Sequence, residues 1–192
     1  MTAELISVGT ELLMGNIVNS NTRFLAEKCA LLGFDMYYQV TVGDNYGRMK
    51  DVIETALKRS DLIILTGGLG PTEDDLTKEV CAAVMGMELV EDPHTRKHLE
   101  AFFVNNIYRE IPENNWKMAT VPKGALVLDN HNGMAPGLIL EREGKAAILL
   151  PGPPGELYPM FNDQVFPWLQ KRQQSVLVSR MVKICECGES QV

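Results

Sequence analysis

Two aspartates each follow an apolar stretch and a glycine-containing turn. Asp44 comes after residues 35–42 and Gly43, and Asp75 comes after residues 62–65 and a glycine-rich loop. Because the carboxyl ends of parallel strands meet at one edge of a sheet, we expect the two carboxylates to converge there. Such a pair can hold a magnesium ion and polarise a pyrophosphate, which makes both aspartates candidate catalytic and metal-binding residues. Alternatively, each aspartate only caps the helix that follows it.

The loop at residues 66–71 cannot continue the strand before it. Pro71 stops the ladder of hydrogen bonds, and the glycines permit positive φ and close approach of the backbone to a ligand. The apolar spacing at 76–84 predicts a helix directly afterwards. Strand, loop and helix N-terminus together form a natural anion site. The candidate phosphate-binding glycines are Gly67, Gly68 and Gly70.

The segment from Thr72 to Asp75 fits the Thr-x-x-Asp signature of a capped helix start, and Thr72 is a further candidate phosphate contact. No Gly-Lys-Ser/Thr follows, so the loop is not a Walker loop. Glu73, Asp74 and Asp75 stand where phosphate oxygens would sit. Carboxylates repel phosphate unless a divalent cation bridges them, so the sequence indicates a metal-assisted phosphate site. A tight turn before a well-capped helix explains the same residues without a ligand.

Two residues early in this predicted helix are also candidates for contacting phosphate. They are Thr77 and Lys78. The ammonium group of Lys78, one turn into the helix, can approach the phosphates of a ligand bound at the loop. A solvated helix face explains this lysine equally well.

A second loop of unusual composition, at residues 151–156, also follows an apolar strand and precedes a predicted helix. By position it lies at the same edge of the sheet as the first loop, where open α/β sheets bind ligands. Polar residues after the first strand can add contacts from a third loop, although helix capping and turn formation explain the asparagines equally well. The candidate substrate contacts from these two loops are Gly152, Pro153, Glu156, Glu11, Asn19 and Asn21.

The whole chain suits one α/β domain. It has 192 residues, of which 45% are hydrophobic, and a net charge of −7. This charge argues against bulk binding to nucleic acid or to a membrane surface, but it allows a local site for a phosphorylated small molecule. No signal peptide precedes residue 4 and no apolar run is long enough to span a bilayer, so we expect a cytoplasmic protein. Cys29 and Cys81 fall on apolar faces of predicted helices, and the small number of cysteines fits a reducing compartment.

The order of predicted elements favours a parallel sheet covered on both faces, because three strand–helix units follow one another with short connections. We expect the strands at 4–8, 35–42, 62–65, 125–128, 138–140 and 146–150, with a hairpin turn at 143–145 and a further strand-like stretch at 176–185. Residues 91–119 are more polar and helical. The domain is predicted to cover residues 1–169, and residues 170–192 are a linker and the start of a following small domain.

Several other motifs are weak or missing. His94 and His98 are spaced i, i+4, but the glutamate of a zinc-protease helix is absent, so a solvated helix face is the better interpretation. Cys185 and Cys187 lack a second metal-binding pair. The sequence contains no evident Ser-His-Asp arrangement or dinucleotide GxGxxG fingerprint.

Four separated motifs, in this order and spacing, resemble the amino-terminal domain of the competence/damage-inducible family CinA. They are VGTELLMGNIVNSN, VGDN, TGGLGPTEDDLTKE and LLPGPPGE, and the resemblance covers residues 3 to 168. It implies a three-layer α/β/α sandwich with a mostly parallel sheet, similar in fold to the molybdopterin-binding domains of molybdenum-cofactor biosynthesis. The carboxyl-terminal nicotinamide-nucleotide amidase domain of many members has no counterpart in these residues, so that activity is not carried over.

The resemblance also implies an activity: hydrolysis of the pyrophosphate of ADP-ribose to AMP and ribose 5-phosphate with a divalent metal, magnesium or cobalt, and with a dependence on potassium. In the molybdopterin relatives, the aspartates matching Asp44 and Asp75 act at a nucleotide-pyrophosphate centre. One alternative is a nucleotidyl- or molybdotransferase acting on molybdopterin, although the loop reads Gly-Gly-Leu-Gly where those relatives usually have Gly-Gly-Thr-Gly. The other is a module that senses a nucleotide without turnover. We expect a small-molecule nucleotide substrate and a homo-oligomer, dimer or trimer.

Overall fold

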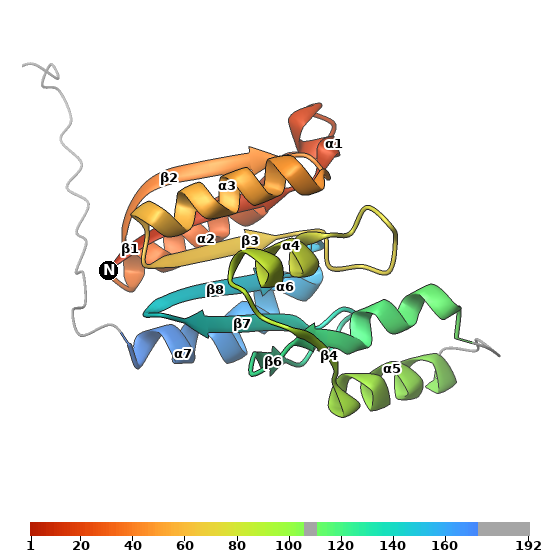
Figure 1. Ribbon diagram of the computed structural model, residues 1–192. Helices are drawn as coiled ribbons and strands as arrows, with labels where there is room; N and C mark the ends of the chain where they lie inside the picture. Colours follow the sequence, from red (N-terminus) through yellow and green to blue (C-terminus); the bar gives the residue numbers. More distant parts are fainter. Residues whose placement is uncertain (106–110, 173–192) are drawn as a thin grey trace, which may run out of the picture.

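A computed structural model describes residues 1–105 and 111–172 as a mostly parallel sheet with helices on both faces (Figure 1). The strand order is β2-β1-β3-β8-β7-β6. The strands are β1 (Thr2–Val8), β2 (Asp35–Val42), β3 (Leu62–Thr66), β6 (Leu126–Leu128), β7 (Gly137–Arg142) and β8 (Lys145–Leu150). The first four in spatial order run parallel, and β7 is antiparallel to both its neighbours. The expected α/β/α sandwich is therefore confirmed.

The order of the strands reverses between β1 and β3. The chain leaves β1 for β2 on one side and then returns to β3 on the other side. All five residues of β3 are buried, which explains its uninterrupted apolar run. The predicted turn between β7 and β8 is also present, with left-handed φ angles of 52° at Glu143 and 77° at Gly144.

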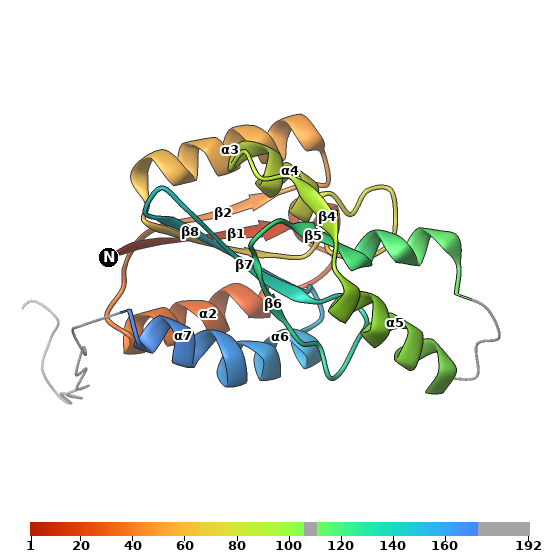
Figure 2. The same ribbon diagram turned by 60° about the horizontal axis from the view of Figure 1, so that its bottom comes forward.

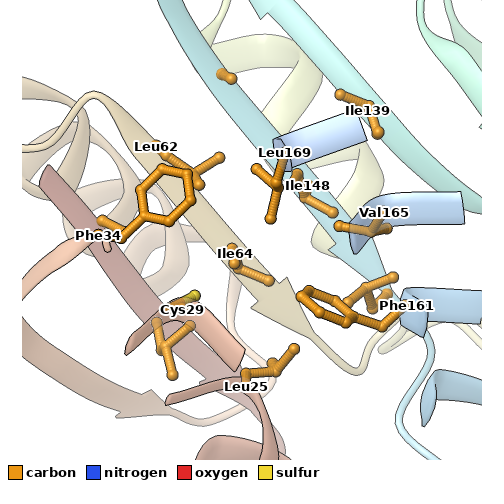
Figure 3. Close-up of a cluster of buried hydrophobic side chains, with 14 of the residues drawn as sticks. Leu25, Cys29, Phe34, Leu62, Ile64, Ile139, Ile148, Phe161, Val165 and Leu169 are labelled. Carbon is orange, nitrogen blue, oxygen red and sulfur yellow. The ribbon is translucent and has the colours of Figure 1, made fainter. Parts of the chain in front are cut away.

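One face of the sheet is covered by α2 (Ser20–Leu31), α6 (Pro154–Met160), the π-helical turn η2 (Phe161–Val165) and α7 (Phe166–Gln170) (Figure 2). Phe161 and Leu25 pack there against β3 and β8 (Figure 3). The other face is covered by α3 (Tyr46–Arg59) and α4 (Thr77–Val84). Cys29 and Cys81 are buried on opposite faces, and burial raises the pKa of each thiol to about 12.

The predicted capping by an asparagine after the first strand is confirmed for α2, whereas the predicted start of α4 is not. Asn19 Oδ1 caps α2 by accepting from Thr22 N at 3.1 Å, and Asn45 caps α3. By contrast, α4 begins only at Thr77, and no side chain caps it. The Thr72–Asp75 signature was wrong as a helix start, because these two residues bond to each other in a loop turn instead.

A small layer beside the main sheet contains the polar region (Figure 1). It consists of a two-stranded antiparallel pair, β4 (Leu89–Glu91) and β5 (Thr120–Pro122), with α5 (Pro93–Asn105) and the 3-10 helix η1 (Glu113–Ala119). Neither three-residue strand was predicted. Leu99 packs there against Met118, and Met134 joins this cluster from the segment before β7.

Three sequence expectations fall wholly or mostly outside the described residues: the strand-like stretch at 176–185, the Cys185 and Cys187 pair, and the second unit at 170–192. Within the described ranges, none of the helices has the length and hydropathy needed to cross a membrane.

Candidate functional site

A cavity of about 570 Å³ opens at the carboxyl edge of the parallel strands. We call it the edge cavity. It is lined by the segments that follow β1, β2, β3 and β8, together with Met118 and Met134 from the neighbouring layer. The reversal of strand order between β1 and β3 falls at this edge, which is where open α/β sheets bind ligands. The volume is typical of a small-molecule site.

Asp44 lies at the β2 side of the edge cavity. Its Oδ2 accepts hydrogen bonds from Thr10 N at 2.8 Å and from Thr10 Oγ1 at 2.9 Å, at the start of the short helix α1 (Thr10–Leu13). Asp44 does not cap the helix that follows it, since Asn45 has that role by accepting from Arg48 N at 3.1 Å. Its Oδ1 makes no hydrogen bond within the described residues and is free for a ligand.

Asp75 reaches the same cavity from the loop after β3. Its Oδ2 accepts from Thr72 N at 3.0 Å, and the Thr72 hydroxyl lies 2.5 Å from this oxygen. The same hydroxyl lies 2.5 Å from an oxygen of Asp74 and, with the backbone N–H of Asp74, lowers the pKa of that carboxyl group. Asp44 and Asp75 therefore line one cavity, as predicted, each with one oxygen held by a threonine.

The three positions of the first loop require glycine for different structural reasons. Gly67 has φ 92°, and a Cβ there would strike the backbone oxygen of Val8. Gly68 has φ 67°, and a Cβ would strike the Thr77 hydroxyl. Gly70 lacks a positive φ, but a Cβ would lie 2.5 Å from Asp75 Oδ2. The third glycine thus makes room for the aspartate, whereas the first two allow the turn itself.

The two glycine-containing loops lie side by side, as expected from their positions. Gly67 N donates to Leu150 O at 3.0 Å, and a Cβ on Gly152 would be 3.7 Å from Gly67 Cα. Asn21 joins them, since its Nδ2 donates to Gly152 O at 2.7 Å. Predicted contacts that line the cavity on these segments are Gly152, Pro153, Glu156, Glu11, Asn19 and Asn21.

Two predicted phosphate contacts do not line the cavity. The hydroxyl of Thr77 donates to Gly67 O at 2.8 Å inside the loop, so this residue stabilises the turn. Lys78 is buried, and its Nζ donates to Lys117 O at 2.6 Å. Lys78 was predicted either to contact phosphate or to lie on a solvated helix face. It does neither in the structure, because its side chain is buried against η1. Desolvation lowers the pKa of its ammonium group.

Lys117 is a residue that the sequence reasoning missed. Its Nζ donates to Thr72 O at 2.8 Å and to the backbone oxygen of Asp75. The ammonium group therefore fixes the turn that presents the Asp75 carboxylate. No motif predicts this contact, because it joins segments more than forty residues apart through backbone oxygens.

Among residues 1–105 and 111–172, all the charged side chains that line the edge cavity are acidic: Glu11, Asp44, Asp74, Asp75 and Glu156. A phosphate group would be repelled here unless it arrived with a cation. Within the described residues, no cluster of three or more His, Cys, Asp or Glu side chains is arranged to hold a metal ion. Magnesium is commonly bound by only one or two carboxylates, with water and substrate phosphates completing its shell. The free Oδ1 atoms of the two threonine-held aspartates fit that donor set.

The histidines of α5 act outside the cavity. His94 Nε2 lies 2.6 Å from Asp129 Oδ1 on an exposed face, and this hydrogen bond with the Asp129 carboxylate raises the pKa of the imidazole. His98 Nε2 lies 3.3 Å from Gly133 O. His94 is exposed, as expected for a solvated helix face, whereas His98 is only partly exposed.

The fold and the edge cavity define a domain of the molybdopterin-binding type. Residues 4–171 match the family described as "Probable molybdopterin binding domain". A solved structure of the protein CinA from Thermoplasma acidophilum, whose function is described as unknown, is 32% identical with a TM-score of 0.78, covering 84% of this chain and 95% of that one. The chain belongs to this molybdopterin-binding-type family and, within it, to the amino-terminal domains of CinA proteins.

More similar sequences carry a provisional name. A relative from Caldicellulosiruptor bescii, provisionally named as a competence-damage inducible protein, is 52% identical over 192 residues, which are 100% of this chain and 46% of the relative. The chain thus spans less than half the length of that relative. The Mog protein from Mycobacterium ulcerans is 20% identical with a TM-score of 0.57, covering 88% of this chain and 97% of that one, and shows a shared fold.

Proposed function

We propose that the edge cavity binds ADP-ribose together with a divalent cation and hydrolyses its diphosphate to AMP and ribose 5-phosphate. The observation that supports this proposal is the pair Asp44 and Asp75. Each has one carboxylate oxygen fixed by a threonine, and within the part of the chain that the structure describes the other oxygen has no hydrogen bond and no basic side chain lines the cavity. Such a cavity suits a diphosphate that enters with a cation.

Binding of the diphosphate falls to the first loop. Among the described residues, no acceptor is found for the backbone N–H groups of Gly68, Leu69 and Gly70. In the proposal these groups donate to phosphate oxygens, with the N-terminus of α4 close behind them. Asp44 and Asp75 would hold magnesium or cobalt through their free oxygens, and the bound cation supplies neutralisation of the phosphate charge.

The chemical step consumes one water molecule. Its oxygen forms a new bond to one phosphorus, the bond from that phosphorus to the bridging oxygen breaks, and the bridging oxygen leaves with the other phosphate. The protons of the water pass to the phosphate products and to solvent. A carboxylate oxygen of Asp44 or Asp75 accepts a hydrogen bond from this water and so orients it for attack. The threonine donors hold each carboxylate in place while this happens.

The second candidate is binding of a molybdopterin-type ligand, with or without nucleotidyl transfer. The family match favours it, and so do the apolar side chains that line the cavity, among them Ile17, Val18, Met118 and Met134, which suit a ring system. A third candidate is a sensor that binds a nucleotide without turnover. All three candidate functions use the same cavity, but they differ in the product that is released from it.

The test is incubation of the purified chain with ADP-ribose and either magnesium or cobalt, with AMP measured by chromatography. Release of AMP supports hydrolysis. Saturable binding without AMP release supports a sensor, and adenylation of molybdopterin supports the transferase. Omission of potassium from the same assay tests the potassium dependence, and light scattering tests the proposed dimer or trimer.

A further inference from the structure

The β8 side of the edge cavity differs from the part that contains the aspartate pair. Glu156, in the first turn of α6, and Asn21, at the start of α2, line this side. The carbonyl oxygen of Gly152, at the end of β8, accepts from Asn21 Nδ2 and so connects the two segments. Asp44 follows β2, which is three positions from β8 in the sheet, or about 14 Å at the usual strand spacing, whereas Asp75 follows β3, which is next to β8.

Asn21 leaves a hydrogen-bond acceptor unsatisfied. Its Oδ1 is buried and has no hydrogen-bond partner. The orientation of the amide is fixed, because Gly152 O at 2.7 Å can only accept and therefore requires the NH₂ group. A buried acceptor without a donor costs free energy, and a ligand that supplies the donor recovers it.

Glu156 presents a second acceptor. Its Oε2 accepts from Asn130 Nδ2 at 2.7 Å, and Asn130 is itself buried and bonded to Ala135 O at 2.8 Å. The Oε1 atom makes no hydrogen bond within the described residues. Gly133 makes room for this carboxylate, since a Cβ there would strike it.

The β8 side of the cavity offers two acceptors, and among the described residues no basic side chain lines it. It therefore favours a ligand group that donates hydrogen bonds and carries no negative charge. A phosphate fails on both counts, because it only accepts at neutral pH and Glu156 repels it. A sugar diol fits, since a carboxylate that accepts from ribose hydroxyls is a general device of nucleotide sites in α/β folds.

We propose that Glu156 and Asn21 form a ribose-hydroxyl subsite, which selects ligands by the diol of a ribose and leaves the phosphates to the first loop. This inference rests on the proposed function and assigns roles within the same cavity. Both residues are predicted from the sequence as substrate contacts, and the subsite assigns them to the ribose. The ribose can be that of the adenosine or the terminal one, since both carry a diol at C2 and C3.

The experiment measures binding calorimetrically with α,β-methylene-ADP-ribose, whose bridging carbon prevents hydrolysis, in magnesium. Two further ligands remove one diol each: the 2′,3′-dideoxyadenosine analogue and α,β-methylene-ADP, which lacks the terminal ribose. The proteins are the wild type, Glu156→Gln and a control, Glu143→Gln, at an exposed turn between β7 and β8. A glutamine keeps the shape of Glu156 and can still accept from Asn130.

We expect Glu156→Gln to weaken binding of the parent ligand about tenfold, the effect of losing one hydrogen bond to a charged group. Removal of the diol that occupies the subsite should weaken binding by the wild type and Glu143→Gln more than tenfold, because the contacts with Glu156 and Asn21 are both lost. In Glu156→Gln the loss should be about tenfold smaller, because only the contact with Asn21 is then removed. The ligand that shows this coupling identifies which ribose is bound. Gly133→Ala, which keeps the carboxylate but displaces it, should behave as Glu156→Gln.

Equal losses in the wild type and Glu156→Gln for both diols would overturn the subsite, and so would a wild type that binds none of the three ligands. Turnover does not enter the measurement. Coupling without hydrolysis of ADP-ribose would therefore leave the subsite standing and refute only the hydrolase, whereas hydrolysis without coupling would refute only the subsite.

Discussion

Asp44 and Thr10 join the ends of β2 and β1 through reciprocal hydrogen bonds. Asp44 Oδ2 accepts from both the backbone N–H and the hydroxyl of Thr10, and the backbone N–H of Asp44 donates to Thr10 Oγ1 at 3.3 Å. Asp75 Oδ2 likewise accepts from the backbone N–H and the hydroxyl of Thr72, but the reciprocal bond to the threonine hydroxyl is not made. Both carboxylates are thus oriented before any ligand arrives, which is what a site that stabilises developing charge requires.

Asn45 and Asp44 are adjacent but serve different purposes. Asn45→Ala removes the cap of α3 and should lower the free energy of unfolding by about 1 kcal/mol while AMP release is retained. Asp44→Asn keeps an oxygen that can accept from Thr10 and should affect AMP release far more than stability. Urea denaturation and the AMP assay on both variants check this. A similar loss of AMP release in the two variants would contradict the division of roles.

Lys117 should act as a positioning residue through the turn at Thr72–Asp75. Lys117→Met frees the two backbone oxygens that its ammonium group holds and should lower kcat/KM about tenfold, with a higher magnesium concentration for half-maximal rate. Lys117→Arg should restore part of the rate because it keeps the charge. Lys123→Met, at an exposed ion pair with Glu88, is the matched control. An unchanged magnesium dependence would leave Lys117 with a structural role only.

Gly67 is the glycine of the first loop that the backbone itself requires. Gly67→Ala places a Cβ against the backbone oxygen of Val8 at a φ of 92° and should destabilise the fold by about 2 kcal/mol. Gly155→Ala is the control, since a Cβ there meets nothing within 4 Å, and its effect should stay within about 0.5 kcal/mol. Chemical denaturation of both proteins gives the comparison. Equal stability of the two variants would disagree with the strain argument.

His94 should make stability depend on pH through Asp129. The hydrogen bond raises the pKa of His94 in the folded state, so its contribution is complete below the ordinary histidine pKa and is lost as pH rises through the raised value. The stability difference between the wild type and His94→Gln should therefore be larger near about pH 5.5 than near about pH 9. The difference should lose this pH dependence in an Asp129→Asn background. Thermal denaturation at both pH values measures it.

Much of the fold could be predicted because local signals and packing agree. The buried run of β3 and the hairpin turn between β7 and β8 each have one natural interpretation, and the structure confirms both. The start of α4 was misplaced because Thr72 and Asp75 satisfy a capping signature and a loop turn equally well, and only tertiary contacts decide. The strands β4 and β5 were missed because three residues carry no clear periodicity.

The candidate site was predictable where residues follow directly from strand ends, as Asp44 and Asp75 do. The site was not predictable where a long side chain can reach more than one partner. Lys78 can extend to the loop or to η1, and its burial against Lys117 O depends on a segment distant in sequence. Lys117 contacts backbone oxygens, which any sequence provides, so no pattern identifies it.

The central claim is tested most directly by AMP release from ADP-ribose in magnesium, measured for the wild type, Asp44→Asn, Asp75→Asn and the control Glu143→Gln. Asparagine keeps the side-chain shape and removes the charge that a cation needs. We predict AMP release by the wild type and the control, and a loss of at least about a hundredfold in kcat/KM for each aspartate variant with unchanged thermal stability. Wild-type rates in both aspartate variants, or no AMP release by the wild type, would contradict the account.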